Sequence, residues 1–106
     1  MDILIGADLV PTKSNIKYFE NKNIEKLIDK NLLEKLNKAD YRIFNLEVPL
    51  VDTKAPINKC GPNLIASTKS GLGIKALGTD FLTLANNHIL DQVMPLINVV
   101  YKEQNI

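Results

Sequence analysis

The sequence has little of what marks secreted, membrane or nucleic-acid-binding proteins. It contains no tryptophan, one cysteine and one histidine among 106 residues. The single Cys60 excludes an internal disulfide, so nothing points to an oxidised scaffold. No apolar run approaches the roughly 20 residues of a membrane-spanning helix, and the N-terminus lacks the basic region and long apolar core of a signal peptide. A cytoplasmic or detached product is the default expectation.

A strong charge of either sign is also missing. Thirteen Lys and Arg residues face twelve Asp and Glu residues, which leaves a net charge of +1. A dedicated nucleic-acid binder is usually clearly basic, so no nucleic-acid partner is expected. The length suits one modest domain, and no repeat or linker divides it. Residues 1–106 are therefore expected to form a single domain.

Three apolar runs predict strands. They are Ile3–Ile5, Tyr41–Glu47 and Phe81–Leu84, and they are rich in the β-branched and aromatic residues that favour strands. Helical patterns follow each run, so the order is β-α-β-α-β-α. This alternation predicts an α/β fold with a parallel sheet and right-handed crossovers, in which the first and third strands are buried.

Apolar residues near a 3.6-residue period predict an amphipathic helix from Ile24 to Leu36. Asn23 is its expected N-cap, and a break is expected near Lys30. The preceding segment, Lys17–Lys22, is expected to be solvated because it is mostly polar.

Two further helices are expected. Residues 68–77 predict a short helix that ends at Gly78, although Gly71 and Gly73 have poor helix propensity. Pro95 suits the first turn of a last helix, with an inner stripe of Leu96, Val99 and Val100.

Polar side chains follow each predicted strand at its carboxyl end. They are Asp8 after the first, Asn45 and Glu47 at the second, and Asn86, Asn87 and His88 after the third. The carboxyl ends of parallel strands share one edge of the sheet, where open α/β sheets bind ligands. Carboxylate and amide oxygens with an imidazole suit a hard or borderline divalent cation.

His88 is the only histidine of the chain. An imidazole can act as an acid, a base or a metal ligand near neutral pH. Two structural interpretations compete with a catalytic one. The Asn86-Asn87-His88 run could be a turn, because Asn tolerates left-handed backbone conformations, or His88 could be a core histidine held by a backbone hydrogen bond.

A long irregular stretch, residues 51–67, follows the second strand. Loops of this length in compact domains are often functional. Lys59 within it could meet an anionic ligand. The competing interpretation is an ordinary exposed lysine.

Two segments, Ala39–Leu50 (ADYRIFNLEVPL) and Leu82–Asp91 (LTLANNHILD), stand out beside Gly6-Ala7-Asp8. Together they resemble the poly-gamma-glutamate capsule-synthesis family, the CapA-type proteins, in the right order and spacing over nearly the whole chain. That family is similar to calcineurin-like metallophosphatases, which hold two metals between packed sheets. The resemblance implies a partial metallophosphatase-like sheet, the truncated N-terminal part of a longer domain.

The resemblance also implies roles for single residues. Asp8 matches the first metal-ligand aspartate, and Asn45 matches the position of a metal-bridging aspartate. Asn87 and His88 match an Asn-His pair in which the Asn binds metal and the His is a general acid or orients the reacting group. Motif positions without an assigned role are Glu47, Asn86 and Asp91.

The sequence departs from the metallophosphatase pattern at several points. Asp8 is followed by Leu9-Val10, where a phosphatase would have Asp-x-His. Asn45 is neutral where a carboxylate would help hold two cations, and the later histidine motifs are missing. These departures predict weak binding of a divalent metal, with Mn²⁺, Fe²⁺ and Zn²⁺ as candidates.

Three functions remain open at this point. The first is a metal-dependent, phosphatase-like hydrolase in capsule biosynthesis, acting on an anionic gamma-glutamyl polymer or a phosphoester. The second is a non-catalytic polymer-binding or assembly module, and the third is an inactive truncated fragment. By the family resemblance, association with the cell envelope is an alternative to the cytoplasm.

Self-association is expected as well. Half a sheet leaves an unpaired strand edge and an uncovered apolar face, and both favour contacts between copies. The third strand or the last helix is the expected contact.

Overall fold

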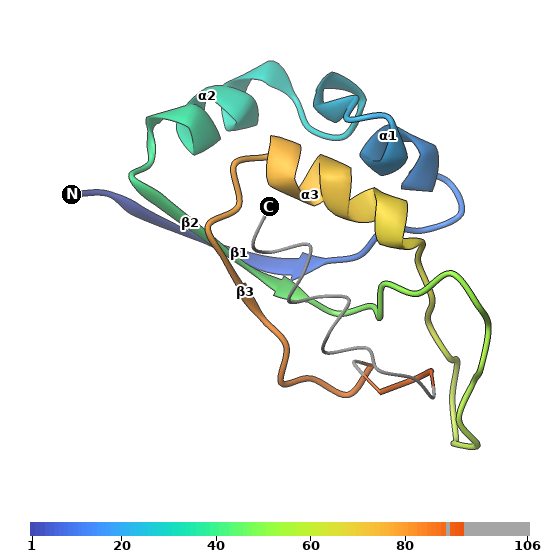
Figure 1. The fold of residues 1–106 in the computed structure, drawn as a ribbon. Helices are drawn as coiled ribbons and strands as arrows, with labels where there is room; N and C mark the ends of the chain where they lie inside the picture. Colours follow the sequence, from blue (N-terminus) through green and yellow to red (C-terminus); the bar gives the residue numbers. More distant parts are fainter. Residues whose placement is uncertain (89, 93–106) are drawn as a thin grey trace.

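The computed structural model describes residues 1–88 and 90–92 of the chain, and its centre is a parallel sheet (Figure 1). The strands are β1 (Ile3–Leu9), β2 (Tyr41–Leu46) and β3 (Phe81–Thr83), in the order β1-β2-β3. Both neighbouring pairs are parallel. The predicted α/β fold with parallel strands is confirmed. The expected last helix, from Pro95 with Leu96, Val99 and Val100, lies outside the described residues.

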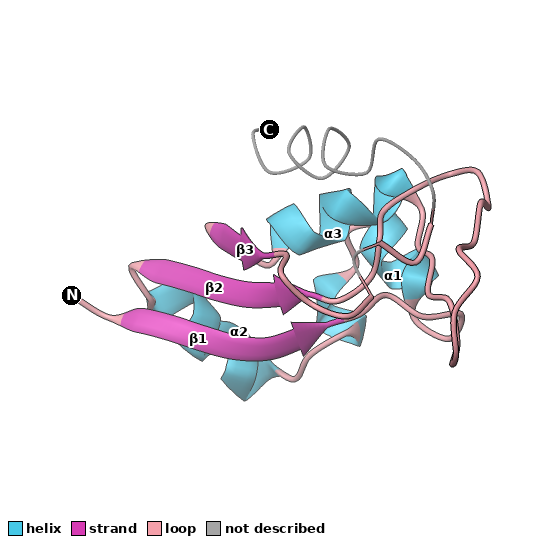
Figure 2. Cartoon of the chain, turned by 90° about the horizontal axis from the view of Figure 1, so that it is seen from below, coloured by secondary structure: helices cyan, strands magenta, loops and turns pink. Residues whose placement is uncertain are grey.

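The helices α1 (Ile16–Glu20), α2 (Lys30–Lys38) and α3 (Gly71–Ala76) lie on one face of this sheet, as Figures 1 and 2 show from two directions. Two right-handed crossovers that advance in the same direction place their helices on the same side. The connections from β1 to β2 and from β2 to β3 therefore cover one face, and none of the helices in residues 1–88 lies on the other. Among the described helices, none is long and apolar enough to cross a membrane.

The predicted helix from Ile24 to Leu36 is wrong in its extent. The segment forms a 3₁₀ turn, η1 (Ile24–Lys26), and then α2 from Lys30. The break precedes Lys30 because the Asp29 carboxylate caps α2, accepting a hydrogen bond from the Leu32 N–H at 2.8 Å. The break also shifts the helical phase, so Leu32 is 44% exposed.

The expectation that Lys17–Lys22 is solvated is also wrong in part. Most of this segment belongs to α1, and Phe19 is only 3% exposed. One aromatic side chain holds the short helix on the core, while the lysines around it face outward.

The predicted helix over residues 68–77 is confirmed as η2 (Thr68–Ser70) followed by α3. Gly78 has φ +82°, a left-handed conformation that favours glycine. Its carbonyl oxygen accepts a hydrogen bond from Arg42 Nε at 2.6 Å. Arg42 Nη1 also donates to Ala39 O at 2.7 Å, so one guanidinium binds carbonyls that follow two helices.

The hydrophobic core lies between the helices and the inner face of the sheet. Its buried members are Phe19, Leu36, Leu46, Val48, Leu50, Val51, Ala66, Ile74 and Leu77. Several come from the segment directly after β2 and its partner near Ala66, where Val51 N–H donates to Ala66 O at 2.7 Å. The start of the long loop is thus part of the core.

The outer face of the sheet is apolar and open, which corrects the expectation of buried first and third strands. Ile3, Ile5, Tyr41 and Phe81 are between 43% and 75% exposed. The rings of Tyr41 and Phe81 lie 6.1 Å apart on neighbouring strands. We call these four residues the outer patch.

Candidate functional site

A β-bulge brings Asp8 beside Asn45. Ile5 pairs with Ile43 but Asp8 pairs with Asn45, so β1 has one residue more than β2 between these pairs. Bulges re-aim side chains next to functional sites. Here the bulge turns Asp8 to the face of Asn45, whose Nδ2 donates to Asp8 Oδ1 at 2.8 Å.

Asn45 connects all three strand ends. Its Oδ1 accepts hydrogen bonds from Thr83 Oγ1 of β3 at 3.0 Å and from Asn86 Nδ2 at 3.2 Å. Asn86 Nδ2 also donates to Leu46 O at 2.8 Å. The structure thus brings together Asp8, Asn45 and Asn86 at the carboxyl edge of the sheet, as the strand order predicts.

Glu47 joins this edge through a carboxyl–carboxylate pair with Asp8. The pKa of Asp8 is lowered by its hydrogen bonds, first from Asn45 and then from Glu47. The pKa of Glu47 is raised, chiefly by its hydrogen bond to Asp8, then by burial and by the negative charge of Asp8. The charge of His88 opposes that rise. Glu47 is therefore the member of the pair that holds a proton more readily.

His88 lies in a turn that also contains Asn87. The turn interpretation of this run is thus correct, and it does not compete with a site. Asn86 Oδ1 accepts the His88 backbone N–H at 3.0 Å, and the His88 ring is held by a carboxylate, because Nδ1 lies 2.7 Å from Asp91 Oδ2. The Asn87 side chain, the predicted metal ligand of the pair, is exposed and lies outside the network centred on Asn45.

Asp91 is a buried carboxylate with three donors. Its side chain is fully buried, and Lys59 Nζ binds Oδ1 at 2.6 Å. The Leu64 backbone N–H and His88 Nδ1 bind Oδ2 at 2.6 and 2.7 Å. Burial on its own would raise the pKa of Asp91, but these partners bring it below its ordinary value.

Lys59 has neither of the two environments expected for it. Its side chain is 20% exposed and its ammonium binds Asp91, so it is neither a solvated lysine nor free for an anionic ligand. The sequence could not reveal this pair, because the partners are 32 residues apart.

The oxygen donors at the sheet edge suit a divalent cation of modest affinity. Asp8 and Glu47 offer two carboxyl groups that interact with each other. The Asn45 amide turns its nitrogen to Asp8 and its oxygen to Thr83 and Asn86. Over the part of the chain that the structure describes, no three His, Cys, Asp or Glu side chains gather into a metal-binding group. The donor set therefore fits one cation completed by neutral oxygens and water better than a closed all-protein site.

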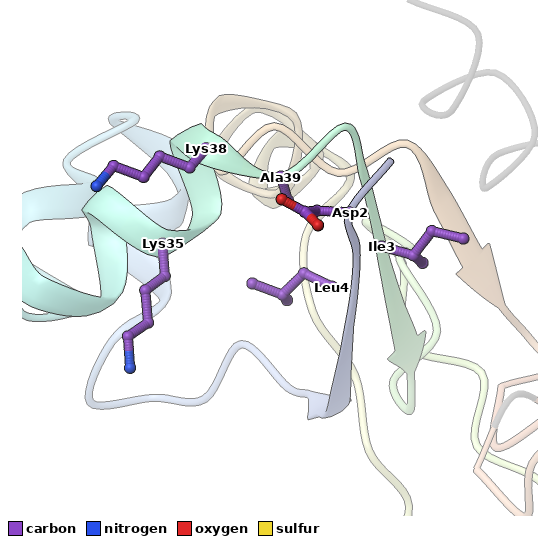
Figure 3. A pocket seen from close by; sticks show the side chains of 6 residues that line it. All are labelled: Asp2, Ile3, Leu4, Lys35, Lys38 and Ala39. Carbon is purple, nitrogen blue, oxygen red and sulfur yellow. The ribbon is translucent and has the colours of Figure 1, made fainter.

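A surface hollow of about 290 Å³ lies away from this edge, beside the amino end of β1 (Figure 3). It is lined by Asp2, Ile3, Leu4, Lys35, Lys38 and Ala39. Both lysine side chains extend away from Asp2 in Figure 3. The hollow is largely apolar and shares no residue with the strand ends.

Three contributors to the site were not predicted from the sequence. Thr83 could have been predicted, because it lies two residues after Phe81 and therefore on the same face of β3, where it pairs with Asn45. For the Leu64 backbone N–H and for Gln92, no pattern in the sequence indicates a place in the site. Gln92 Oε1 accepts the Ala55 N–H at 2.7 Å, and its Nε2 donates to Leu64 O at 3.1 Å, so it fastens the long loop to the segment after His88.

Comparison with known proteins agrees with the motifs that this edge contains. A search of the curated proteins finds no match. A family model described as "Bacterial capsule synthesis protein PGA_cap" matches residues 3–95, which include all three strands and every predicted site residue. The resemblance to capsule-synthesis proteins is thereby confirmed, together with the metallophosphatase-like general fold of that family. The chain belongs to the bacterial capsule synthesis protein PGA_cap family.

Proposed function

We propose that the carboxyl edge of the sheet is a metal-dependent hydrolytic site that acts on an anionic, gamma-glutamyl capsule polymer. The observation that supports this most is the meeting of Asp8, Asn45 and Glu47 at one point, with His88 close enough to affect the ionisation of Glu47. Acidic, amide and imidazole groups from separate strand ends are the components that metal-assisted hydrolysis needs.

Asp8 and Glu47 would hold the cation, and Asn45 would add its amide oxygen if its side chain turned over, because that oxygen now accepts from Thr83 and Asn86. Asn87, exposed in the next turn, would supply a further neutral oxygen. Mn²⁺, Fe²⁺ and Zn²⁺ are the candidate ions. When bound, such an ion would polarise the carbonyl or phosphoryl group that is attacked.

His88 would act as the general acid. Asp91 is an ionised carboxylate at neutral pH, so it can only accept hydrogen bonds, and Nδ1 of His88 must donate. Nε2 is then the ring nitrogen left for the substrate, and it would carry the proton for a leaving group only in the imidazolium form, in which both ring nitrogens are protonated. General acid–base catalysis contributes about 10²–10⁴-fold in rate, so His88→Ala is expected to lower turnover by that order.

The charges of the site link the polymer to the metal. Asp8 and Glu47 place negative charge at the edge, and Lys59 is already bound to Asp91. An anionic polymer would be repelled by this edge unless a cation neutralises it. Binding of poly-gamma-glutamate is therefore expected to require the divalent ion, and so is binding of a phosphoester, the other substrate considered.

Calorimetric titration with Mn²⁺ tests the metal site. The wild-type chain is expected to bind weakly, and Asp8→Asn should weaken binding about tenfold or more, because it removes the carboxyl group of the pair that ionises more readily. Asp29→Asn is the matched control, because it makes the same charge change away from the edge and Asn remains a good helix cap. Equal Mn²⁺ affinity in wild type and Asp8→Asn would refute the site.

A non-catalytic polymer-binding module is the second candidate. It is favoured by the small number of charged ligands, since no three His, Cys, Asp or Glu side chains cluster in the described segments. The two candidates differ in one measurement. Mn²⁺-dependent binding of poly-gamma-glutamate without chain shortening, unchanged by His88→Ala, would support the module, whereas shortening that His88→Ala removes would support the hydrolase.

A further inference from the structure

The long loop between β2 and η2 is fastened to the turn that contains His88. The Ile57 backbone N–H donates to Asp91 O at 2.9 Å, and Pro56 pairs with Gln92 in an isolated antiparallel bridge. Lys59 and the Leu64 N–H add the two bonds to the Asp91 carboxylate. Asp91 is thus bound by the loop on one side and by His88 on the other.

A fully buried carboxylate is costly unless it is paired and hydrogen-bonded. Lys59 is the cation that binds Asp91, and the Leu64 N–H is a neutral donor. Among the described residues, the charged groups that bind Asp91 are Lys59 and His88, and His88 also acts electrostatically on Glu47. If Lys59 were removed, His88 would be the one described side chain left to balance the charge of Asp91.

We propose that Lys59 is a positioning residue that acts through Asp91 to hold the His88 imidazole as the Nδ1–H tautomer. The Lys59 ammonium keeps Asp91 ionised and fixed at Oδ1, so that Oδ2 accepts from His88 Nδ1. Nε2 is then left for the reacting group. The consequence of this positioning for catalysis rests on the proposed function of His88. The tautomer and the attachment of the loop do not depend on that function.

Without Lys59, two changes would each release the ring. Asp91 could become protonated and donate a hydrogen bond to an unprotonated Nδ1, so that the ring proton would lie on Nε2. Alternatively, the carboxylate could withdraw toward water and free both His88 and the Leu64 N–H. In either case the Nδ1–H tautomer is no longer favoured over the Nε2–H tautomer, and the loop is attached to Asp91 by fewer bonds.

Nitrogen NMR of the imidazole measures this directly, because the chain has one histidine and its ring signals are unambiguous. At about pH 8.5, above the usual titration range of imidazoles, the two ring nitrogens report the tautomer. Wild type should show the proton on Nδ1. Lys59→Met should lose this preference and should speed amide exchange at Leu64 about tenfold or more.

Two variants control for the loss of a lysine as such. Lys59→Arg keeps a cation that can bind a carboxylate and should retain the wild-type tautomer and the slow exchange at Leu64. Lys54→Met removes a charge from the same loop, where the side chain is exposed, and should change neither. If Lys59→Met does not fold, Lys59→Gln, which removes the charge but keeps a donor, has to show the same loss.

A folded Lys59→Met or Lys59→Gln protein that retains the Nδ1–H tautomer would overturn the proposal. The result is independent of the hydrolase assay. If His88→Ala leaves polymer shortening unchanged, the proposed function fails, but the effect of Lys59 on the tautomer still stands or falls by the NMR measurement.

Discussion

Gly73 is the position where helix propensity and tertiary packing predict opposite effects. In the middle of α3, an alanine should be better than glycine by about 1 kcal/mol. However, Gly73 is buried where α3 crosses α1, and a Cβ atom there would lie 2.4 Å from Phe19 Cα and 2.5 Å from Phe19 O. Carbon atoms in contact prefer about 3.5–4.0 Å, so Gly73→Ala requires the two helices to move apart by roughly 1 Å.

The magnitude follows from two opposing effects. Overpacking in a well-packed core costs about 1–3 kcal/mol, and occasionally more. The clash is with backbone atoms of Phe19, so no rotamer change relieves it, and the movement also loosens a side chain that is 3% exposed. After the gain in propensity is subtracted, Gly73→Ala should destabilise the fold by about 1–2 kcal/mol, which lowers Tm by at least roughly 5 °C in a domain of this size.

Urea denaturation followed by circular dichroism provides the measurement, with Lys75→Ala in the same helix as the control. Lys75 is exposed, so its replacement should change the free energy of unfolding by less than about 0.5 kcal/mol. A Gly73→Ala protein as stable as wild type, or more stable, would show that α1 and α3 do not approach as closely as described. The reasoning about their contact would then be wrong.

Two further perturbations test the buried carboxylate and the outer patch. Asp91→Asn should lower the free energy of unfolding at neutral pH by about 2–3 kcal/mol, because an amide cannot accept from all three donors. Because the folded pKa of Asp91 is depressed, the carboxylate's contribution is present above the unfolded value near 3.8 and is lost as the pH falls through the folded pKa. The urea curves of wild type and variant should therefore converge below about pH 4, and a constant difference down to pH 2 would contradict this. Self-association, measured by sedimentation at increasing concentration, should be reduced by Ile5→Glu on the outer patch but not by Leu32→Glu on α2, and a strictly monomeric wild type would contradict it.

Local sequence signals were sufficient to predict the three strands and the end of α3. The three apolar runs and Gly78 each act through neighbours in the chain, by strand propensity or by backbone conformation. The burial of Phe19 was missed because it depends on contacts with α3, far along the sequence. For the same reason, propensity alone misjudged Gly73.

The position of the site at the sheet edge was predictable from the sequence, whereas the hydrogen-bond partners of its side chains were not. Parallel strands place the carboxyl ends of β1 and β2 at one edge, but the bulge that turns Asp8 to the face of Asn45 carries no signal in the sequence. The attachment of Lys59 to Asp91, which in turn binds His88, depends instead on how a loop of irregular structure folds back on the turn. No periodicity specifies such a path, because Lys59 and Leu64 lie far from Asp91 in the sequence, although the bond between His88 and Asp91 is local.

The bulge in β1 explains why the outer patch and the site lie on one face. Side chains alternate along a strand, so without an extra residue Asp8 would point to the helices while Ile5 points outward. The shift between Ile5 and Asp8 places Asp8 on the outer face with Asn45 and Thr83, directly beyond the apolar residues of the same strands. Any layer that covers the outer patch would therefore also form a wall of the site. At the proposed cation site, affinity and coverage of the outer face should therefore change together, since a wall on that side would exclude water from Asp8 and Glu47 and strengthen their attraction for a cation.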